Sequence, residues 1–408
     1  MASRTGIVSE PFRMLVVDLE PTPYKTDLWN AFSDSKEVEL SVIYTERRNW
    51  APDGGHNYEK WPEYRHDQVV LGGQGMLGAL RSAVVVVGRI FRNRADLTVI
   101  AGYDRLATVA AIFCVALTGR NFVVHADELN NLWPKGRLVW LKLMVRELLR
   151  KIVFTRGDAL LVCGKRGVES ALKARCPQNK VLDFPYIIDV ERIKADDSGE
   201  PPLACRKDLY DAKLVIFFSG RMIPRKGLPT LLTALARLKT ARKDWMLWIE
   251  GDGPELSRYL KLAQELNVDG QCRFLGFCQY DIHSWLVRCA DIIVVPSLED
   301  PWGIVVDEGL QLGKAVVSSD ATGSGYDRIE SGHNGYIFPA GDVNALTRCL
   351  GVLIDDDEQR RQFGFFAAVS PKNLRAQDNL DTLLGLIRDQ LGLEYEKVAQ
   401  VDNNKSKR

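Results

Sequence analysis

The sequence predicts an α/β protein with two doubly wound domains, and three observations support this prediction. Short apolar runs rich in Val, Ile and Leu alternate with amphipathic stretches, as in βαβ units whose parallel sheet is buried on both faces. The alternation stops near residue 190 and resumes near residue 213. The chain of 408 residues is also too long for a single ordinary core.

Residues 1–190 are predicted to form the first Rossmann-like domain. Five runs are typical of buried parallel strands, since each is short, mostly apolar and ends in glycine or a polar residue. They are FRMLVVDL (12–19), VELSVIY (38–44), LTVIAG (97–102), NFVVHAD (121–127) and ALLVCG (159–164). The amphipathic stretches between most of them predict helices that cover the sheet.

Residues 213–375 repeat this pattern and predict a second Rossmann-like domain. Its predicted strands are KLVIFFSGR (213–221), WMLWIEGDG (245–253), CRFLGF (272–277), ADIIVVPS (290–297) and KAVVSSD (314–320). After the first strand, LPTLLTALARLK has apolar residues at helical spacing. After the second, PELSRYLKLAQELN opens with proline, which favours a helix start.

The other segments connect or follow the two domains. Residues 191–212 contain Asp-Asp, Ser-Gly and Pro-Pro without a clear period, which predicts an interdomain linker. Residues 376–394 contain the amphipathic stretch NLDTLLGLIRDQLG and predict a C-terminal helix. The polar end at 395–408 is predicted to be disordered.

Composition and charge argue against several classes of protein. Lys and Arg total 54 against 53 Asp and Glu, so no basic excess indicates nucleic-acid binding. The eight cysteines form no CxxC pair and favour reduced thiols in a cytoplasmic protein, and five scattered histidines argue against a His-rich metal site. The N-terminus lacks the apolar core of a signal peptide, and no apolar run approaches the about 20 residues that span a bilayer. Any membrane contact is therefore expected to be peripheral.

A basic loop follows the first strand of the second domain, where Gly220 precedes Arg221 and Lys226. Open α/β sheets bind ligands beyond the carboxyl ends of their strands. Two cations among glycines suit a diphosphate, because glycine lets the backbone approach and the cations offset phosphate charge. Taken alone, a solvated basic loop explains these residues equally well. The later GDGP segment is better interpreted as a tight turn before a helix.

An acidic loop follows the strand ADIIVVPS and contains Asp300 eight positions before Glu308. IVVDEGLQLG predicts a short helix here, so the amides of Ile304 and Val305 would form an anion site. Acidic residues in a first helical turn are favoured even without function, which accounts for Glu308. It does not account for Asp300, whose carboxylate could accept hydrogen bonds from sugar or ribose hydroxyls.

Five motifs occur in order: GR…KG, GDGP, RFLGF, the segment ADIIVVPSLEDPWGIVVDEGLQLGKAVVSSD, and SGHNGYIFPAGDVNAL. Together they resemble the C-terminal domain of the GT-B glycosyltransferases of family 4, which are retaining nucleotide-sugar enzymes. The resemblance covers about residues 213–375. It implies a GT-B fold with two domains facing across a cleft and a C-terminal helix that crosses back to the first domain. It also implies a nucleoside-diphosphate sugar as donor, with no cofactor and no metal.

The resemblance assigns roles to individual residues. Arg221 and Lys226 would hold the donor diphosphate, Glu308 would bind ribose hydroxyls, and Asp300 would contact hydroxyls of the transferred sugar. The first acidic position of this pair is commonly Glu, so the adjacent Glu299 is an alternative to Asp300. Other donor-binding candidates are Gly220, Phe274, Leu275, Gly276, Phe277, Glu299, Trp302, Gly303, Ile304 and Val305.

The first half resembles the family less closely. Many relatives have a Gly-Gly loop after the first strand, where this chain has DLEPTPYKTDLWNAF, similar to a Pro-Tyr variant in some bacterial polysaccharide transferases. His125 lies at a strand end, where relatives place a histidine that faces the sugar. A structural hydrogen bond is the alternative role for such a histidine. The other acceptor-side candidates are Pro23, Tyr24, Lys25, Asp127 and Glu128.

The resemblance also implies a mechanism. Breaking the donor bond creates positive charge at the anomeric carbon and negative charge on the departing diphosphate, which Arg221, Lys226 and backbone amides would stabilise. Retention in the family is thought to proceed by front-face attack, in which the leaving phosphate accepts the acceptor's proton. Closure of the two domains would exclude water.

The segment 134–154 predicts a basic amphipathic helix that could touch a membrane, with its core at 135–153. Its two faces carry cations at Lys142, Arg146 and Arg150 and apolar residues at Leu141, Val145, Leu148 and Ile152. The cations could face anionic headgroups, or the apolar face could simply pack on the sheet with the cations in water. Both arrangements could also hold together.

These observations predict a retaining glycosyltransferase that moves a sugar to a hydroxyl of a glycan or lipid-linked glycan, in bacterial polysaccharide or glycolipid assembly. Its expected location is the cytoplasm or the inner face of the cytoplasmic membrane. One alternative is a sugar-nucleotide epimerase or hydrolase of the same architecture. Another is a catalytically silent homologue that acts as a scaffold, although the presence of Arg221, Lys226 and Glu308 argues against it.

Overall fold

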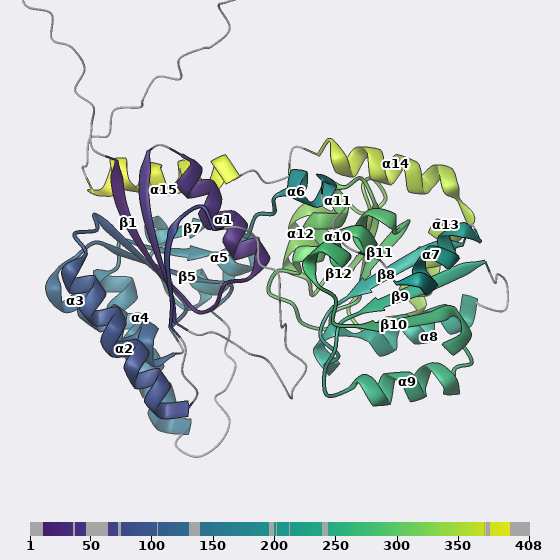
Figure 1. The fold of residues 1–408 in the computed structure, drawn as a ribbon, viewed down its shortest axis with the longest axis horizontal. Helices are drawn as coiled ribbons and strands as arrows, with labels where there is room; N and C mark the ends of the chain where they lie inside the picture. The colour runs from purple at the N-terminus through teal and green to yellow at the C-terminus, as the bar shows by residue number, and fades with distance from the viewer. Residues whose placement is uncertain are drawn as a thin grey trace, which may run out of the picture.

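A computed structural model describes residues 11–35, 37–45, 64–71, 75–103, 105–129, 139–195, 200, 202–211, 213–238, 244–370, 372 and 376–391. The predicted tail at 395–408 and the start of the predicted basic helix at 135–138 lie outside the described residues. The described chain forms two α/β domains, each built on its own parallel sheet (Figure 1).

The first sheet has seven parallel strands in the order β3-β2-β1-β4-β5-β6-β7. They are β1 (Phe12–Asp18), β2 (Val38–Tyr44), β3 (Asp67–Val70), β4 (Leu97–Ala101), β5 (Phe122–Ala126), β6 (Ala159–Val162) and β7 (Val181–Asp183). The five predicted strands form its centre. Along β1 the side chains alternate between two cores, with Val16 packed on one face and Leu15 and Val17 on the other.

Helices cover both faces of the first sheet. They are α1 (Pro23–Asp34), α2 (Gly75–Arg92), α3 (Leu106–Thr118), α4 (Val139–Arg156) and α5 (Gly164–Lys173). Helix α1 packs its Leu28, Trp29 and Phe32 on one face, and the other helices contribute to the core on the opposite face. This is the doubly wound arrangement that the sequence predicts.

The second sheet has six parallel strands in the order β10-β9-β8-β11-β12-β13. They are β8 (Leu214–Ser219), β9 (Trp245–Glu250), β10 (Cys272–Gly276), β11 (Ile292–Val295), β12 (Ala315–Ser319) and β13 (Tyr336–Phe338). Its helices are α7 (Leu203–Tyr210), α8 (Leu228–Leu238), α9 (Leu256–Glu265), α10 (Tyr280–Cys289), α11 (Ile304–Gln311), α12 (Gly323–Arg328), α13 (Val343–Asp355) and α14 (Asp357–Ala368). The strand order reverses between β8 and β11, and ligands of such sheets bind beyond the carboxyl ends at this point.

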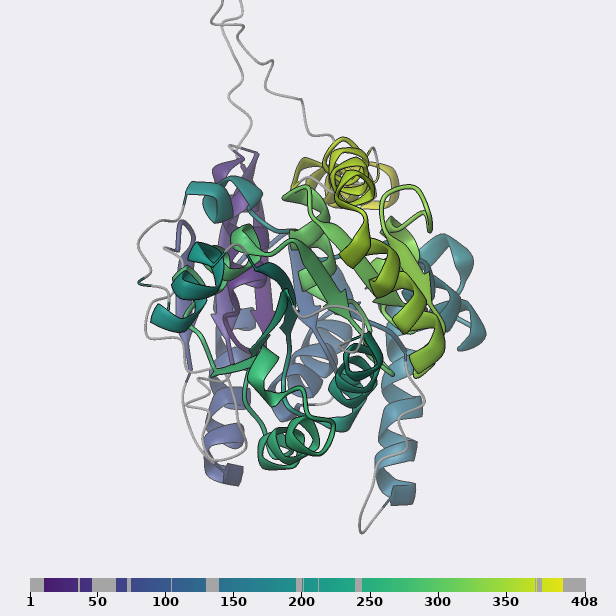
Figure 2. The same cartoon turned by 90° about the vertical axis from the view of Figure 1, so that its right-hand side faces the viewer.

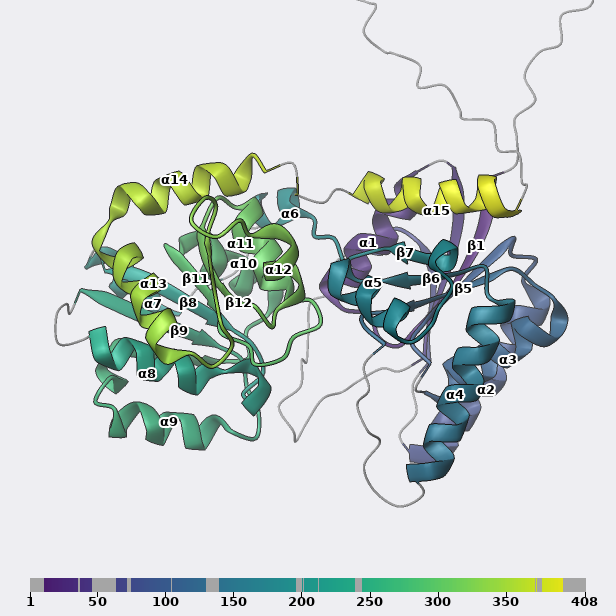
Figure 3. The same cartoon turned by 180° about the vertical axis from the view of Figure 1, so that it is seen from behind.

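The chain passes between the domains twice. Helix α6 (Val190–Ala195) lies in the first passage, and α15 (Ala376–Leu391) returns to the first domain after the second (Figure 3). The Asn379 side chain donates to the Pro185 carbonyl at 2.6 Å, and Leu380, Leu383 and Leu384 are buried in the first domain's core. The predicted crossing of the C-terminal helix is therefore confirmed.

Helix α4 decides between the arrangements that the sequence left open for its two faces. Packing of Leu141, Val145 and Leu148 on the sheet was one of these arrangements, but all three side chains are exposed. Arg150 was expected to face water or lipid headgroups, but it is only 9% exposed. The reason is that the first turns of α4 project beyond the sheet, so that only its last turns are packed on the core (Figure 3).

The first turns of helices α2 and α4 project on the same side of the molecule. These two helix ends are apart from each other (Figure 2). Among the described residues, no helix is both long enough and apolar enough to cross a membrane.

Candidate active site

The loops after β8 and β11 bring the predicted cation and carboxylate into contact. Lys226 Nζ lies 2.6 Å from Asp300 Oδ2, and Ser297 Oγ donates to the same oxygen at 3.3 Å. Gly227 makes this approach possible, because its φ is +70° and a Cβ there would lie 1.9 Å from the Pro296 carbonyl oxygen. The site thus joins residues that lie 74 positions apart in the chain.

The alternative carboxylate, Glu299, lies on the surface of the same loop. Glu299 is exposed, whereas Asp300 is 6% exposed and faces Lys226. The exposed loop also holds Arg225, whose guanidinium donates to the Glu299 carbonyl at 3.2 Å. This geometry favours Asp300 over Glu299 as the carboxylate of the site.

The chain segments at the ends of β8, β9 and β10 approach one another closely at three glycines, Gly220, Gly251 and Gly276. A Cβ on Gly251, after β9, would lie 2.0 Å from the Gly220 carbonyl oxygen after β8, and the Gly251 amide donates to the Gly276 carbonyl at 2.7 Å. Arg221 follows Gly220 and is half-buried, as is the segment 274–277 that contains Phe274, Leu275 and Phe277. The predicted diphosphate loop and the predicted base-binding segment therefore follow β8 and β10, the two strands on either side of β9.

Helix α11 begins beyond β11 at Ile304, and Gly303 caps its N-terminus. Gly303 adopts a left-handed conformation with φ +84°, and a Cβ there would come within 2.5 Å of Thr322. The turn starts α11 directly after the acidic loop, so the first-turn amides of Ile304 and Val305 lie at the positive end of the helix. Such an end can bind an anion.

Trp302 supports this loop from inside. It is 3% exposed, and its indole nitrogen donates to Asp307 Oδ2 at 2.7 Å. Burial raises the pKa of Asp307 to about 6, although Arg328 opposes this effect. The Arg328 guanidinium also lies 5.2 Å from the Trp302 ring centroid. The Trp302 ring is therefore committed to packing, and its contribution to a ligand would come from its backbone.

Glu308 is held by a histidine that the sequence analysis missed. His283 Nε2 lies 2.9 Å from Glu308 Oε2, and His283 Nδ1 lies 2.6 Å from Glu250 Oε2. Burial disfavours the charged ring, but the two carboxylates more than offset this and raise the pKa of His283 well above 6.5. His283 is therefore an imidazolium that donates to both carboxylates. The sequence signal was a histidine within the helix YDIHSWLVRC, which the scatter of the five histidines obscured.

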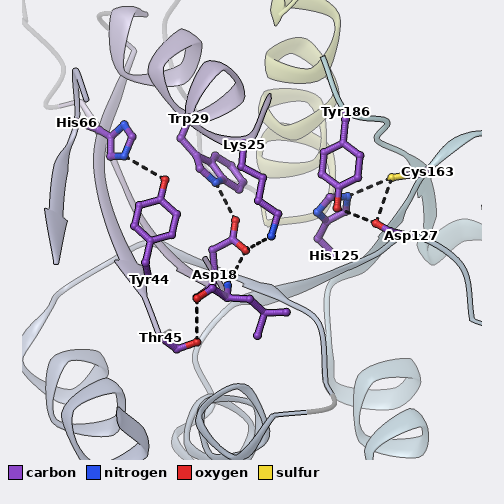
Figure 4. Close-up of polar contacts among 11 residues, drawn as sticks. Asp18, Lys25, Trp29, Tyr44, Thr45, His66, His125, Asp127, Cys163 and Tyr186 are labelled. Atoms are coloured by element: carbon purple, nitrogen blue, oxygen red, sulfur yellow. Dashed lines mark hydrogen bonds and ion pairs between the residues drawn. The ribbon is translucent and has the colours of Figure 1, made fainter. Parts of the chain in front are cut away.

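The first domain contributes a second set of polar residues at the ends of β1 and β5 (Figure 4). Lys25 Nζ lies 2.5 Å from Asp18 Oδ1, and the Trp29 indole donates to Asp18 Oδ2 at 3.1 Å. Burial alone would lower the pKa of Lys25, but Asp18 raises it above its ordinary value. Lys25 is thus a fixed cation. Asp18, which ends the first strand, was not among the predicted site residues.

The predicted acceptor-side residues His125 and Asp127 lie around Tyr186 (Figure 4), and the Tyr24 ring packs against the Tyr186 ring as well. The His125 and Tyr24 rings lie 5.3 and 4.7 Å from the Tyr186 ring, and the Tyr186 hydroxyl donates to Asp127 Oδ1 at 2.7 Å. His125 is 3% exposed, and burial lowers its pKa, so its ring is neutral near pH 7. Its Nε2 lies 3.6 Å from the Cys163 sulfur. The ring also hydrogen-bonds the Phe184 backbone, so buried neighbours hold it in place.

The remaining acceptor-side candidates are Pro23 and Glu128. Pro23 is buried at the start of α1. Glu128 pairs with Arg166 at 3.2 Å and lines a pocket of about 670 Å³ between α4, α5 and the loop after β12. Arg150, Asp320 and Tyr326 also line this pocket, whereas Lys226, Asp300 and Glu308 do not.

Comparisons with known proteins agree with this architecture. The glycosyl transferases group 1 family matches residues 206–368. A GDP-mannose-dependent monoacylated alpha-(1-6)-phosphatidylinositol monomannoside mannosyltransferase of Corynebacterium glutamicum is 30% identical over 352 residues, covering 82% of this chain and 85% of that protein. The lipopolysaccharide core biosynthesis glycosyltransferase LpsE of Rhizobium meliloti is 32% identical over 174 residues, covering 43% of this chain and 46% of LpsE. For LpsE and several other relatives the match spans about half of the relative's length.

Solved structures show the same fold. HepE of Anabaena, crystallised with UDP and glucose, superimposes with a TM-score of 0.72 at 18% identity, covering 92% of this chain and 100% of that one. The two facing parallel-sheet domains define the GT-B fold of glycosyltransferases. Together with the mannosyltransferase match, this shows that the chain belongs to the group 1 glycosyltransferases.

Proposed function

We propose that this protein is a retaining glycosyltransferase that moves a sugar from a nucleoside-diphosphate sugar to a hydroxyl of a glycan or lipid-linked glycan. The observation that carries the proposal is the contact of Lys226 with Asp300 at the strand ends where the second sheet reverses its order. The HepE crystals contain UDP and glucose, and the corynebacterial relative is named as GDP-mannose-dependent. Both names support a nucleotide-linked donor, with UDP and GDP as the first nucleotides to test.

The proposed reaction breaks the bond between the anomeric carbon and the diphosphate oxygen. The bonding electron pair leaves with the diphosphate, where Lys226, Arg221 and the first amides of α11 would stabilise the negative charge. The acceptor hydroxyl forms the new bond on the same face, and its proton passes to the departing phosphate. Asp300 would orient the sugar hydroxyls and Glu308 the ribose. In this scheme no step needs a metal or another cofactor.

We further propose that the protein works at the inner face of the cytoplasmic membrane on a lipid-linked acceptor. The support comes from the projecting ends of α2 and α4. Met76 and Leu77 are 80% and 82% exposed, and Trp140 and Met144 are each 61% exposed. An exposed cation, Arg81, follows on the second turn of α2. Apolar residues beside cations favour contact with an anionic lipid surface. The contact proposed here is therefore apolar insertion, rather than the cationic face of α4.

The donor is tested by thermal unfolding with UDP-, GDP- and ADP-sugars, since a ligand of the folded state raises the melting temperature. Release of nucleoside diphosphate is then measured with and without a membrane lipid extract. The proposal expects one nucleotide class to stabilise the protein and its release to require the extract. Equal release without acceptor would instead indicate a hydrolase. No stabilisation and no release would indicate a silent scaffold.

The membrane contact is tested by co-sedimentation with vesicles of phosphatidylcholine and phosphatidylglycerol. A Trp140→Glu/Met144→Glu variant should lose binding. A Phe365→Glu variant serves as the control, because Phe365 is 63% exposed but lies on α14 of the second domain. Equal binding of the two variants would contradict the proposed contact. Binding that high salt abolishes in the wild type would favour headgroup attraction over apolar insertion.

A further inference from the structure

The proposed ribose carboxylate, Glu308, has both of its oxygens held by neighbouring side chains. His283 holds Oε2 at 2.9 Å, and the Tyr280 hydroxyl lies 3.4 Å from Oε1. Glu308 is 2% exposed. A buried carboxylate that is gripped at both oxygens has little freedom to rotate, so its direction depends on Tyr280 and His283.

Tyr280 is in turn covered by a cation from the interdomain passage. The Arg192 guanidinium, from α6, lies 4.3 Å from the centroid of the Tyr280 ring. Helix α6 packs against α10, and Ile188 and Ile193 join Tyr280 in a small apolar cluster. The contact is thus largely shielded from water, which strengthens the attraction between cation and ring.

Arg192 is anchored on its other side by the first domain. Its Nε and Nη2 lie 3.1 and 2.5 Å from the two oxygens of Asp27, which is 5% exposed on α1. The Asp189 amide donates to Asp27 at 3.2 Å, and Asp189 in turn accepts from the Arg192 amide at 3.0 Å. A bidentate pair of this kind defines one relative orientation of its two partners.

We infer that Asp27, Arg192 and Tyr280 are positioning residues that fix helix α1 of the first domain relative to Glu308 of the second. The inference rests on the proposed function, in which Glu308 receives the donor ribose. A buried charge that loses its partner costs free energy, so a movement between the domains would keep the contacts among Asp27, Arg192 and Tyr280. The domains would then rotate about these contacts. Tyr24 and Lys25 lie within one turn of Asp27 on α1, so the same contacts join the proposed acceptor side to the proposed donor side.

The inference is tested by calorimetric titration with UDP and with GDP. Asp27→Asn lies in the first domain but is expected to weaken binding of the nucleotide that the wild type binds by at least about five-fold. Asp34→Asn is the matched control, because Asp34 lies on the same helix and its side chain is half exposed in a surface pair with Arg65. It should leave the dissociation constant unchanged.

Two features separate positioning from a general loss of folding. A destabilised variant lowers the number of binding sites per chain, whereas a positioning defect raises the dissociation constant of the folded protein. In addition, an Asp27→Asn/Tyr280→Phe double variant should bind the nucleotide about as tightly as whichever single variant has the lower affinity. The reason is that both changes interrupt the same series of contacts. Three results would each overturn the inference. They are fully additive effects in the double variant, an unchanged dissociation constant for Asp27→Asn, and a loss of binding sites with no change in the dissociation constant.

A failure of the proposed function would look different. If the wild type binds UDP or GDP and Lys226→Met weakens that binding, the proposed donor site is supported. Unchanged nucleotide binding by Asp27→Asn would then refute the positioning inference but not the proposed function. If UDP, GDP and ADP all fail to bind, the proposed function fails. Hydrogen exchange then decides the positioning claim. A Tyr280→Leu change in the second domain should speed amide exchange in α1, and unchanged exchange there would refute it.

Discussion

The contact between Lys226 and Asp300 has two separable consequences, one for stability and one for catalysis. The two charged atoms are 2.6 Å apart, and the side chains are 19% and 8% exposed. Removing one partner of a buried pair costs about 3–5 kcal/mol. Because Lys226 is partly exposed, we expect Lys226→Met to lower the free energy of unfolding by about 2–3 kcal/mol.

The catalytic consequence comes from the leaving diphosphate. A single group that stabilises developing charge contributes about 10²- to 10³-fold to kcat. Lys226→Met should therefore slow acceptor-dependent release of nucleoside diphosphate by at least about 100-fold. Denaturant unfolding and the release assay measure the two effects on the same samples.

A second substitution separates them. In Lys226→Met/Asp300→Asn the uncompensated carboxylate is gone, so stability should return to within about 1 kcal/mol of the wild type. Activity should stay far below that of Asp300→Asn alone, because the diphosphate still lacks its cation. Lys261→Met is the control, since Lys261 is a 77% exposed lysine on α9 and should change neither quantity. If the double variant is as active as Asp300→Asn, Lys226 merely neutralises Asp300 and the reasoning is refuted.

Three further predictions concern the supports of the site. Gly227→Ala should lower the free energy of unfolding by at least about 2 kcal/mol, because φ is +70° and the new Cβ would meet the Pro296 carbonyl oxygen. Gly270→Ala is the control and should be neutral in the same unfolding experiment, because no atom lies within 4 Å of a Cβ at that position. For His283, a folded-state pKa raised well above 6.5 gives stability that is complete below about pH 6.5 and lost as the pH rises through that pKa. His283→Gln should therefore be most destabilising near pH 6 and progressively less so as the pH rises, and a constant difference would contradict the imidazolium. Leu383→Ala on α15 should cost about 2–5 kcal/mol in urea unfolding, because the side chain is 1% exposed in the first domain's core; a cost below about 1 kcal/mol would argue against this docking.

The central strands were predictable because strands buried on both faces appear as continuous apolar runs. The runs that contain β1, β4, β8 and β11 all show this pattern. The short edge strands β3 (Asp67–Val70) and β7 (Val181–Asp183) escaped prediction, since their residues are half-buried or exposed and carry no apolar run.

The candidate site was predictable only in part. The spacing from Asp300 to Glu308 lies within one loop and helix, so it could be recognised along the chain. His283 acquires its role from Glu250 and Glu308, which are 33 and 25 positions away, and only the packed sheet brings these residues together. Asp18 presents the same case, because its partners Lys25 and Trp29 reach it only after α1 folds back on the sheet.

Two arrangements of α4 stayed open because helical spacing shows that an apolar stripe exists but not what lies beneath it. The first turns of α4 project past the sheet, which leaves Leu141 and Leu148 without a core to cover. Arg150 turns inward instead and pairs with Glu147 at 3.1 Å.

The most direct test of the account compares nucleoside diphosphates with monophosphates by calorimetry, using UDP against UMP and GDP against GMP. A site that uses Lys226, Arg221 and the start of α11 to hold the leaving group should bind one diphosphate at least about ten-fold more tightly than its monophosphate, since a charge-assisted hydrogen bond contributes about 1.5–3 kcal/mol. Lys226→Met should remove most of that difference. Equal affinity for the diphosphate and the monophosphate would contradict the proposed binding of the diphosphate by these residues. A difference in affinity that remains in Lys226→Met would contradict it as well.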